Sequence, residues 1–186
     1  MIGTLPPPAS FVDLVRSRDG ATVLWAADHV FSRRIVNGVW EDVFQLDGAA
    51  AMQPLGSNVP GKYLAYLSSG TTVAIWSAPD GVWQAVRPAE RPWGPSFPIN
   101  GGSPPAARLQ LASGGRRALA IWATSDLHAN EYSDLIGWRG VMQAENQATP
   151  VSDAAVVYDS TTNTFVAIWL QANAAGLVDV LSSSYR

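Results

Sequence analysis

Cysteine is absent from the 186 residues, and lysine occurs only once. Without cysteine the chain has no disulfide, no thiolate nucleophile and no Cys-ligated zinc site, and its redox compartment stays undetermined. Charged residues make up only 15% of the chain and the formal net charge is −3. Such a chain has no strongly basic surface with which to neutralise a phosphate backbone, so we expect no nucleic-acid partner.

Long apolar segments are missing as well. No apolar run approaches the ~18 residues that a membrane-spanning helix needs, so we expect no membrane partner. The opening "MIGTLPPPAS" has neither the charged region nor the apolar core of a secretory signal. What the chain does have is 47% hydrophobic residues with 16 glycines and 13 prolines. This composition favours many short strands and turns over long helices.

A four-letter pattern that ends in tryptophan occurs four times, closing on Trp25, Trp76, Trp122 and Trp169. The spacings of 51, 46 and 47 residues are typical of propeller blades or helical arrays. Each copy follows a short alternating segment and a turn, as in "KYLAYLSSGTTVAIW", which predicts a β-hairpin. None of these windows holds a helical apolar period, so the repeats are strands.

Two further strands follow each tryptophan, so each repeat predicts a four-stranded antiparallel meander. A lone meander cannot bury both faces and must stack on its neighbours, which gives an all-β fold, a β-propeller with four blades in the chain. The chain is then a single domain of residues 1–186, with repeats at approximately 9–47, 60–100, 106–146 and 152–186. In "VAIW", Ala74 and Trp76 should face one neighbouring blade and Val73 and Ile75 the other.

The last repeat stops before its fourth strand. Residues 1–5 resemble the missing piece, and we expect this N-terminal strand to close the last blade. Such a join would cover an edge that could otherwise template aggregation. It can be made within one chain, giving a monomeric four-bladed ring, or between two chains, giving a strand-exchanged homodimer.

The unit "VAIWSAPDGVWQAVRPAERPWGPSFPI" resembles the repeat of bacterial β-propellers in the broad sialidase-like and propeller-lectin group. The resemblance covers essentially all of residues 1–186 and implies the fold, but the group includes glycosidases, lectins and scaffolds. The sialidase Asp-box is not intact in "SRDGATVLW" or "SAPDGVW", so sialidase activity does not carry across. The sequence leaves the location of the protein unknown, although we favour an extracellular one.

The loops between the second and third strands of each repeat should share one face of the ring and hold the ligand-binding residues. We expect this site to comprise Asp28, His29, Asp80, Trp83, Asp126, His128, Glu131 and Tyr132. The segment from Ala123 to Asp134 is the longest such loop and carries several carboxylates. Two histidines without cysteine are a thin ligand set, so we expect no metal and no cofactor, and turn formation explains many of these short polar residues.

Arginine and aromatic side chains suggest what such a site would bind. Trp83 and Tyr132 could stack on sugar rings. Arginines lie on or beside the third and fourth strands, at Arg33, Arg34, Arg87, Arg91 and Arg139. Arginine suits bidentate recognition of carboxylates, as in acidic sugars, although arginine on outer strands more often lies along the surface.

Three functions remain open from the sequence. The favoured one is a ligand-binding module, lectin-like, that takes a glycan or another small ligand on one face of the ring. The alternatives are a glycan-active hydrolase with carboxylates at the channel mouth, such as Asp28 or Asp80 with Asp126 or Glu131, and a protein-binding scaffold. No catalytic motif is present, and the separation of carboxylates that a hydrolase requires is not given by sequence.

Overall fold

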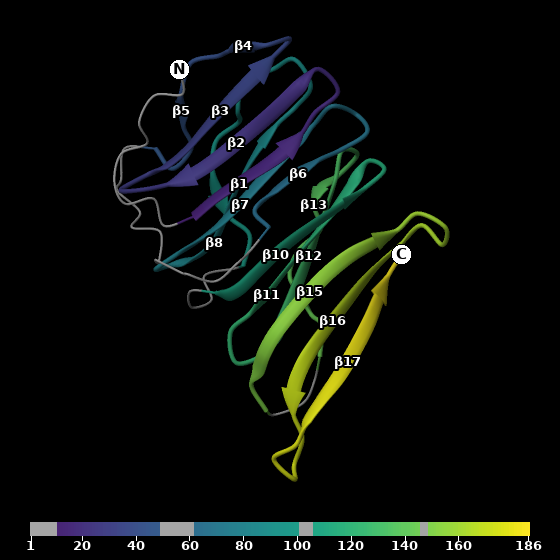
Figure 1. Ribbon diagram of the computed structural model, residues 1–186. Helices are drawn as coiled ribbons and strands as arrows, with labels where there is room; N and C mark the ends of the chain where they lie inside the picture. Colours follow the sequence, from purple (N-terminus) through teal and green to yellow (C-terminus); the bar gives the residue numbers. More distant parts are fainter. Residues whose placement is uncertain (1–10, 49–61, 101–105, 146–148) are drawn as a thin grey trace.

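The computed structural model of the chain describes residues 11–48, 62–100, 106–145 and 149–186 (Figure 1). All regular secondary structure in these ranges is β-strand, arranged in four antiparallel sheets that follow one another along the chain. The fold is thus an all-β propeller type, as the sequence predicts. Among the described residues no helix is long and apolar enough to cross a bilayer.

Each sheet is a blade built around a central hairpin. Blade 1 contains β1 (Phe11–Arg16), β2 (Gly20–Ala26), β3 (Val30–Val36), β4 (Val39–Trp40) and β5 (Phe44–Gln45). Blade 2 contains β6 (Leu64–Tyr66), β7 (Thr72–Ala78), β8 (Gly81–Arg87) and β9 (Phe97–Pro98). Blade 3 contains β10 (Ala107–Gly114), β11 (Arg117–Ala123), β12 (Leu127–Ser133), β13 (Gly137–Trp138) and β14 (Met142–Gln143). Blade 4 contains β15 (Val151–Asp159), β16 (Thr164–Ala172) and β17 (Val178–Tyr185).

The outer strands are short and interrupted. In blade 1 both β4 and β5 pair with β3, and in blade 3 both β13 and β14 pair with β12. The sharp turn from β3 to β4 uses Asn37 and Gly38, whose φ values of 48° and 83° suit these two residue types. Blade 4 has three strands in the described part of the chain. Residues 1–5, predicted to complete this blade, lie outside the described residues.

The repeated tryptophan segments form the centre of the blades, and in blades 2 and 3 they are buried on both faces. In blade 3, Ala120 and Trp122 pack in a cluster shared with blades 1 and 2. Their neighbours Leu119 and Ile121 belong to a second cluster, shared with blade 4. Alternate side chains therefore face opposite neighbours, as period-2 alternation requires.

The blades stack in chain order as an open arc (Figure 1). β1 packs on β6, β6 and β7 pack on β10, and β10 and β11 pack on β15. The two outermost sheet faces of this arc, on blade 1 and blade 4, carry exposed apolar residues such as Leu14 and Val180. The described part of the chain is thus a series of blades with two open ends.

Candidate functional site

A polar cleft lies between blades 1 and 2, where two arginines from different sheets meet. Arg34 is in β3, on the same side of the sheet as Leu24, which packs against blade 2. Arg87 ends β8 and stands opposite Thr72 of β7. Both side chains are largely buried, with 15% of Arg34 and 14% of Arg87 exposed. Two guanidinium groups that share one semi-buried cleft need anionic partners.

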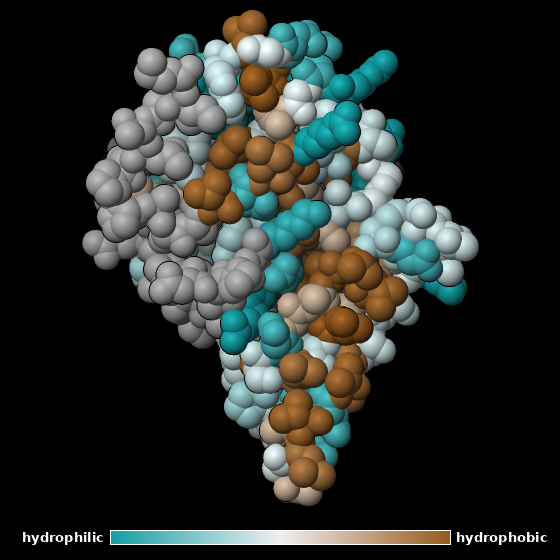
Figure 2. Space-filling view, viewed as in Figure 1, coloured by the Kyte–Doolittle hydropathy of each residue, from teal (hydrophilic) through white to brown (hydrophobic). Residues whose placement is uncertain are grey.

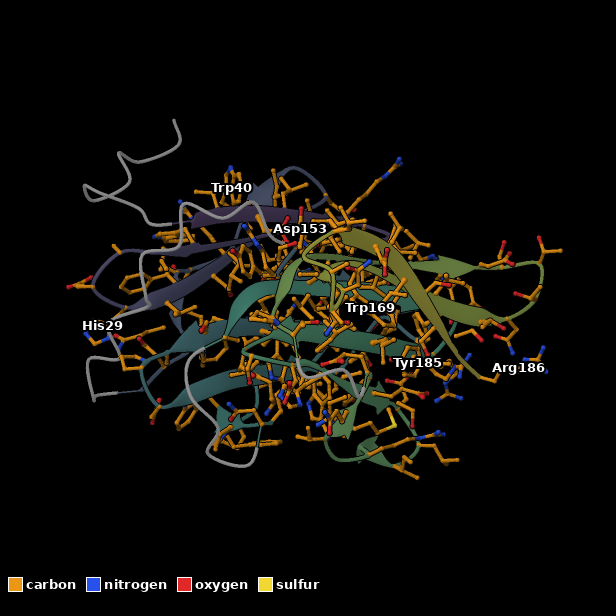
Figure 3. All side chains as sticks on the ribbon, turned by 90° about the horizontal axis from the view of Figure 1, so that it is seen from below. His29, Trp40, Asp153, Trp169, Tyr185 and Arg186 are labelled. Atoms are coloured by element: carbon orange, nitrogen blue, oxygen red, sulfur yellow. The ribbon has the colours of Figure 1, made fainter. Side chains whose placement is uncertain are left out.

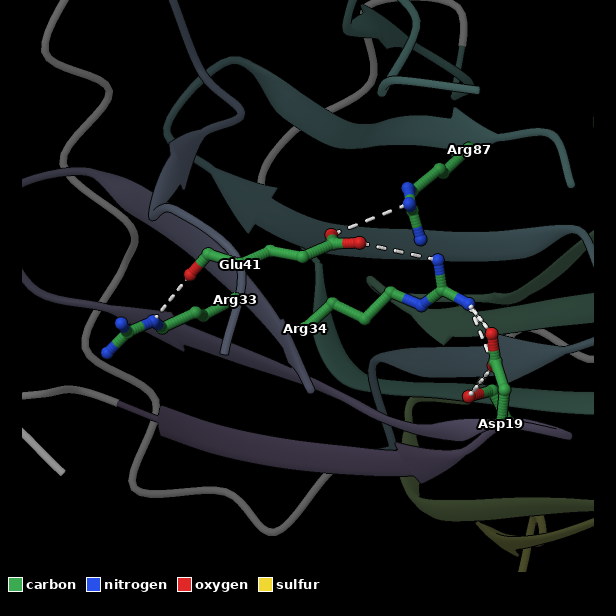
Figure 4. A network of polar contacts seen from close by, with 6 residues as sticks. Asp19, Arg33, Arg34, Glu41 and Arg87 are labelled. Atoms are coloured by element: carbon green, nitrogen blue, oxygen red, sulfur yellow. Dashed lines mark hydrogen bonds and ion pairs between the residues drawn. The ribbon is translucent and has the colours of Figure 1, made fainter. Parts of the chain in front are cut away.

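Two carboxylates balance these arginines, and they do so unequally (Figure 4). Asp19, in the β1–β2 turn, accepts two hydrogen bonds from Arg34 Nη2, at 2.8 and 2.6 Å. Glu41 lies between the arginines, with its oxygens 3.6 Å from Arg34 Nη1 and 3.5 Å from Arg87 Nη2. Glu41 is 45% exposed. Asp19 is therefore a tight partner, whereas Glu41 is a loose and displaceable one.

Two groups of the cleft, Asp19 and Arg87, have lowered pKa values. The hydrogen bond from Arg34 lowers the pKa of Asp19, and Ser17 adds to the effect with a hydrogen bond of its own. Burial lowers the pKa of Arg87, and the nearby positive charge of Arg34 lowers it further, while Glu41 and Asp19 oppose the shift. Because it is buried, Arg87 has given up part of its hydration shell. An anionic ligand that replaced this hydration would stabilise the charged form.

Arg33 fixes the position of Glu41 from the other direction. Its Nε donates a 2.8 Å hydrogen bond to the backbone carbonyl of Glu41 (Figure 4). The guanidinium carbon of Arg33 lies 5.3 Å from the ring centre of Trp40, a cation–π contact. The backbone at Glu41 is therefore held in place while its carboxylate remains loosely bound.

Two cavities adjoin this network and share Arg34. One has a volume of about 200 Å³ and is lined by Thr22, Ser32, Arg33, Arg34, Glu41, Asp42, Phe44, Arg87, Pro92 and Trp93. The other has a volume of about 460 Å³ and is lined by Arg18, Asp19, Arg34, Asn37, Tyr66, Ser68, Ser69, Gly70, Ala89 and Glu90. In the first, the hydroxyl of Thr22 is buried and has no hydrogen-bond partner among the described residues. Charges, hydroxyl groups and an indole thus line one small space, the mixture that polar ligands require.

The residues that the sequence placed in the site do not line this cleft: some lie in the turns joining second and third strands, and the others lie in β8 and β12. Asp28 and His29 are in the β2–β3 turn, and Asp80 is in the β7–β8 turn. His29 Nδ1 is 3.1 Å from Asp47 Oδ2, and the other oxygen of Asp47 is 3.2 Å away. Asp47 is buried and also accepts a hydrogen bond from the backbone of Val30. His29 therefore has a partner in its own blade, and it lies at the end of the molecule away from Arg186 (Figure 3).

Asp80 and Trp83 are brought together. The Trp83 indole donates a 2.9 Å hydrogen bond to the Asp80 carboxylate. Trp83 stands opposite Trp76 in the β7–β8 ladder and is partly buried against the core. As a ligand-stacking residue, Trp83 stays a prediction.

The third repeat differs from its predicted form. The segment from Ala123 to Asp134 is not one long loop, because Leu127–Ser133 forms strand β12 after a tight turn that contains Asp126. Glu131 is in this strand with its side chain only 3% exposed, 3.4 Å from both Arg117 and Arg139. These two arginines neutralise the carboxylate, which lets a strand carry it into the interface with blade 4.

The neighbours of Glu131 on β12 also have partners in the fold. His128 stacks on Trp122 with ring centres 5.9 Å apart, and its Nε2 is 3.2 Å from the hydroxyl of Thr124. Tyr132 meets Trp138 edge-to-face at 5.6 Å, and burial raises its pKa. No group of three His, Asp or Glu side chains that could hold a metal is found in the described ranges.

Only the arginines of the cleft between blades 1 and 2 could be predicted from the sequence. Arginines at the third and fourth strands were recognisable as carboxylate-binding groups. Asp19 and Glu41 were not, because a turn aspartate and a strand-edge glutamate are common and carry no spacing that links them to a second blade. The available signal was the pairing of Arg34 and Arg87 on successive repeats.

Comparisons with known proteins support the fold and assign no family. No family model matches the sequence, and no curated protein matches it. Among solved structures, AofleA from Arthrobotrys oligospora matches with a TM-score of 0.54 and 10% identity, over 94% of this chain and 52% of that one. The WD40 repeats of RRP9 match with a TM-score of 0.53 and 10% identity, over 96% and 52%. A GH62 α-L-arabinofuranosidase catalytic domain from Coprinopsis cinerea matches at 0.48 and 11%, over 95% and 64%.

The chain matches only part of each of these solved structures. The chain spans between 52% and 64% of the length of these three solved structures, whereas they cover nearly all of the chain. At this level of identity the likeness shows the β-propeller fold alone.

Proposed function

We propose that the protein is a ligand-binding propeller module of lectin-like type that takes an acidic glycan in the cleft between blades 1 and 2. The observation that carries the proposal is the pair of largely buried guanidinium groups, Arg34 and Arg87, whose shared counter-ion is the loosely held Glu41. A sugar carboxylate can replace the Glu41 carboxylate between the two arginines. Arginine is suited to this exchange because its planar fork matches a carboxylate.

The rest of the cleft supplies groups that a sugar requires. Sugar hydroxyl groups can donate to or accept from Ser32 and Thr22, whose buried oxygen has no partner within the described structure. The walls contributed by Phe44 and Trp93 are aromatic and suit the apolar face of a sugar ring. The cavity of about 200 Å³ limits the ligand to a single terminal sugar unit.

The test compares a glucuronic-acid glycoside with the neutral glucoside of the same aglycone, in titrations that follow a glycan-array screen. We expect the acidic glycoside to bind more tightly than the neutral one. Arg87→Gln should remove this preference, because it deletes one of the two charges while retaining hydrogen-bonding capacity. Arg91→Gln is the matched control, since Arg91 is exposed and forms no ion pair with the described residues.

The result that would contradict the proposal is an Arg87→Gln protein that binds both glycosides as the unaltered protein does. Loss of binding in the Arg91→Gln control would equally contradict it, since it would show that net charge and not the cleft selects the ligand. A glycan array that detects only neutral glycans would instead favour a site at Asp80 and Trp83.

A further inference from the structure

Blade 4 exposes a sheet face that the other blades bury. Ile121 in β11 and Ile168 in β16 hold the same position, directly before the repeated tryptophan. Ile121 is fully buried because blade 4 covers it, whereas Ile168 is 48% exposed. The strand β16 therefore presents to solvent the face that β11 presents to the next blade.

The exposed face of blade 4 carries apolar side chains from all three of its strands, beside Asp153, Ser182 and Ser184 on the same side of the sheet. The register places Ala155 of β15 and Leu170 and Val180 around Ile168 on this side of the sheet. Together they line a shallow cavity of about 260 Å³. Val157, Val178 and Val180 are each exposed by more than half. Figure 2 shows these apolar side chains gathered over the C-terminal strands in the lower part of the view. A contiguous apolar surface of this kind marks an interaction site.

Blade 1 exposes the other side of a blade, the side that packs against the preceding blade elsewhere in the chain. Val12 and Leu14 of β1 stand opposite Trp25 and Val23 in the register. The equivalent positions in blade 4 are Ala154 and Val156, opposite Trp169 and Ala167. There, these side chains pack in the cluster between blades 3 and 4. In blade 1 the equivalent residues have no preceding blade, and Val12 and Leu14 are 55% and 58% exposed.

We propose that a second copy of the chain covers both faces, with blade 4 of each copy packed on blade 1 of the other. The contact would repeat the blade-to-blade interface that already occurs within the chain, with the same alternating side chains and the same stacking direction. Because each copy offers one face of each kind, a two-fold axis satisfies all four open faces at once and closes a ring of eight blades. A contact between two like faces would leave the other two exposed.

The experiment measures the mass of the full chain in solution by size-exclusion chromatography with light scattering. Two copies of 19.8 kDa are expected. Leu14→Asp and Val180→Asp should each shift the protein to the monomer, because each places a charge in one half of the interface. Leu135→Asp is the matched control, since Leu135 is 91% exposed but lies in the β12–β13 turn, away from both faces. Both altered side chains are already more than half exposed in one chain, so the far-ultraviolet circular dichroism should be unchanged.

Mixing the two monomeric variants tests the direction of the contact. A dimer of Leu14→Asp with Val180→Asp contains one interface in which both halves are altered and one that is intact. The mixture should therefore recover dimer that neither variant forms alone. A monomeric parent protein, an assembly larger than two copies, a Leu14→Asp protein that remains dimeric, or a mixture that stays monomeric would each overturn the proposal.

Discussion

Glu41 carries its carboxylate between two guanidinium groups and is bound tightly by neither. Its two ion-pair distances are 3.6 and 3.5 Å, and nearly half of its side chain is exposed. An ion pair with a half-exposed carboxylate and contacts longer than a hydrogen bond contributes little, which is why a ligand can compete with this one. Asp19, in contrast, is joined to Arg34 by two short hydrogen bonds and orients that guanidinium. Asp19 thus orients Arg34, whereas Glu41 is the counter-ion that a ligand can displace.

Glu41→Gln should increase the affinity for the acidic glycoside. The substitution removes the competing negative charge and retains the shape of the side chain. A gain of about two- to fivefold is expected from the small energy of an exposed ion pair. Isothermal titration against the glucuronic-acid glycoside measures the change, and binding of the neutral glycoside is the internal control. A lower affinity for the acidic ligand would show that Glu41 itself contacts the sugar.

Asp19→Asn should remove a pH-dependent part of the stability. Because the folded-state pKa of Asp19 is lowered by Arg34, its ionised form stabilises the fold above the unfolded pKa of ~3.9. That contribution is lost as the pH falls through the lower, folded-state value. The melting temperatures of the two proteins should therefore differ at neutral pH and converge in strong acid. A difference that persists unchanged at pH 2 would show that the side chain acts by some means other than its charge.

Gly114 is required for the packing of blade 4 on blade 3. A Cβ atom at this position would lie 2.2 Å from the ring atoms of Tyr158. Gly114→Ala should therefore cost ~1–3 kcal/mol in the free energy of unfolding. The same substitution in a Tyr158→Ala background should cost much less, because the clash is absent there. Denaturant unfolding of the four proteins gives the coupling directly, and equal costs in both backgrounds would show that backbone effects dominate.

The strand β12 shows why one element was predicted wrongly and the central strands were not. In its sequence "LHANEYS" every residue except His128 and Tyr132 is buried, but three of the buried side chains are polar, so no apolar alternation is visible. Arg117 and Arg139 compensate for the charge of Glu131, and both come from other strands or turns. Sequence patterns detect apolar alternation, and they do not detect a buried carboxylate whose partners lie elsewhere. The central strand β11, with no such residue, was identifiable at once.

The strand β11 should be sensitive to both overpacking and truncation. Ala120 and Trp122 are fully buried in the cluster shared with blade 2. Ala120→Leu should cost ~1–3 kcal/mol because the blades cannot separate to accept the larger side chain. Trp122→Ala should cost ~3–5 kcal/mol through the cavity it leaves, which also removes the ring on which His128 stacks. Near-neutral denaturant midpoints for both variants would contradict this account of the blade interface.

The blades of the whole molecule should differ in local stability. The strand β7 is buried along its entire length, whereas β17 is mostly exposed and is the outermost strand of the last sheet within the described residues. Amides in β7 should exchange with solvent only through global unfolding, and those in β17 through local opening. Hydrogen exchange on the monomeric Val180→Asp protein measures this difference without the second copy. Uniform protection across the four blades would indicate that they unfold as one unit.

The sequence by itself determined the repeated hairpins, the alternation within them and the tryptophans that fill the spaces between blades. These features are local, since strand pairing within a hairpin depends on residues a few positions apart. Only the tertiary structure decided that Arg34 and Arg87 meet over Glu41 and that Glu41 is the weaker of two acidic partners. It also decided that the outer faces of blades 1 and 4 are exposed in a single copy of the described chain. These features depend on how one sheet sits against the next. That placement is fixed by side-chain packing between distant residues, which no spacing within a single repeat records.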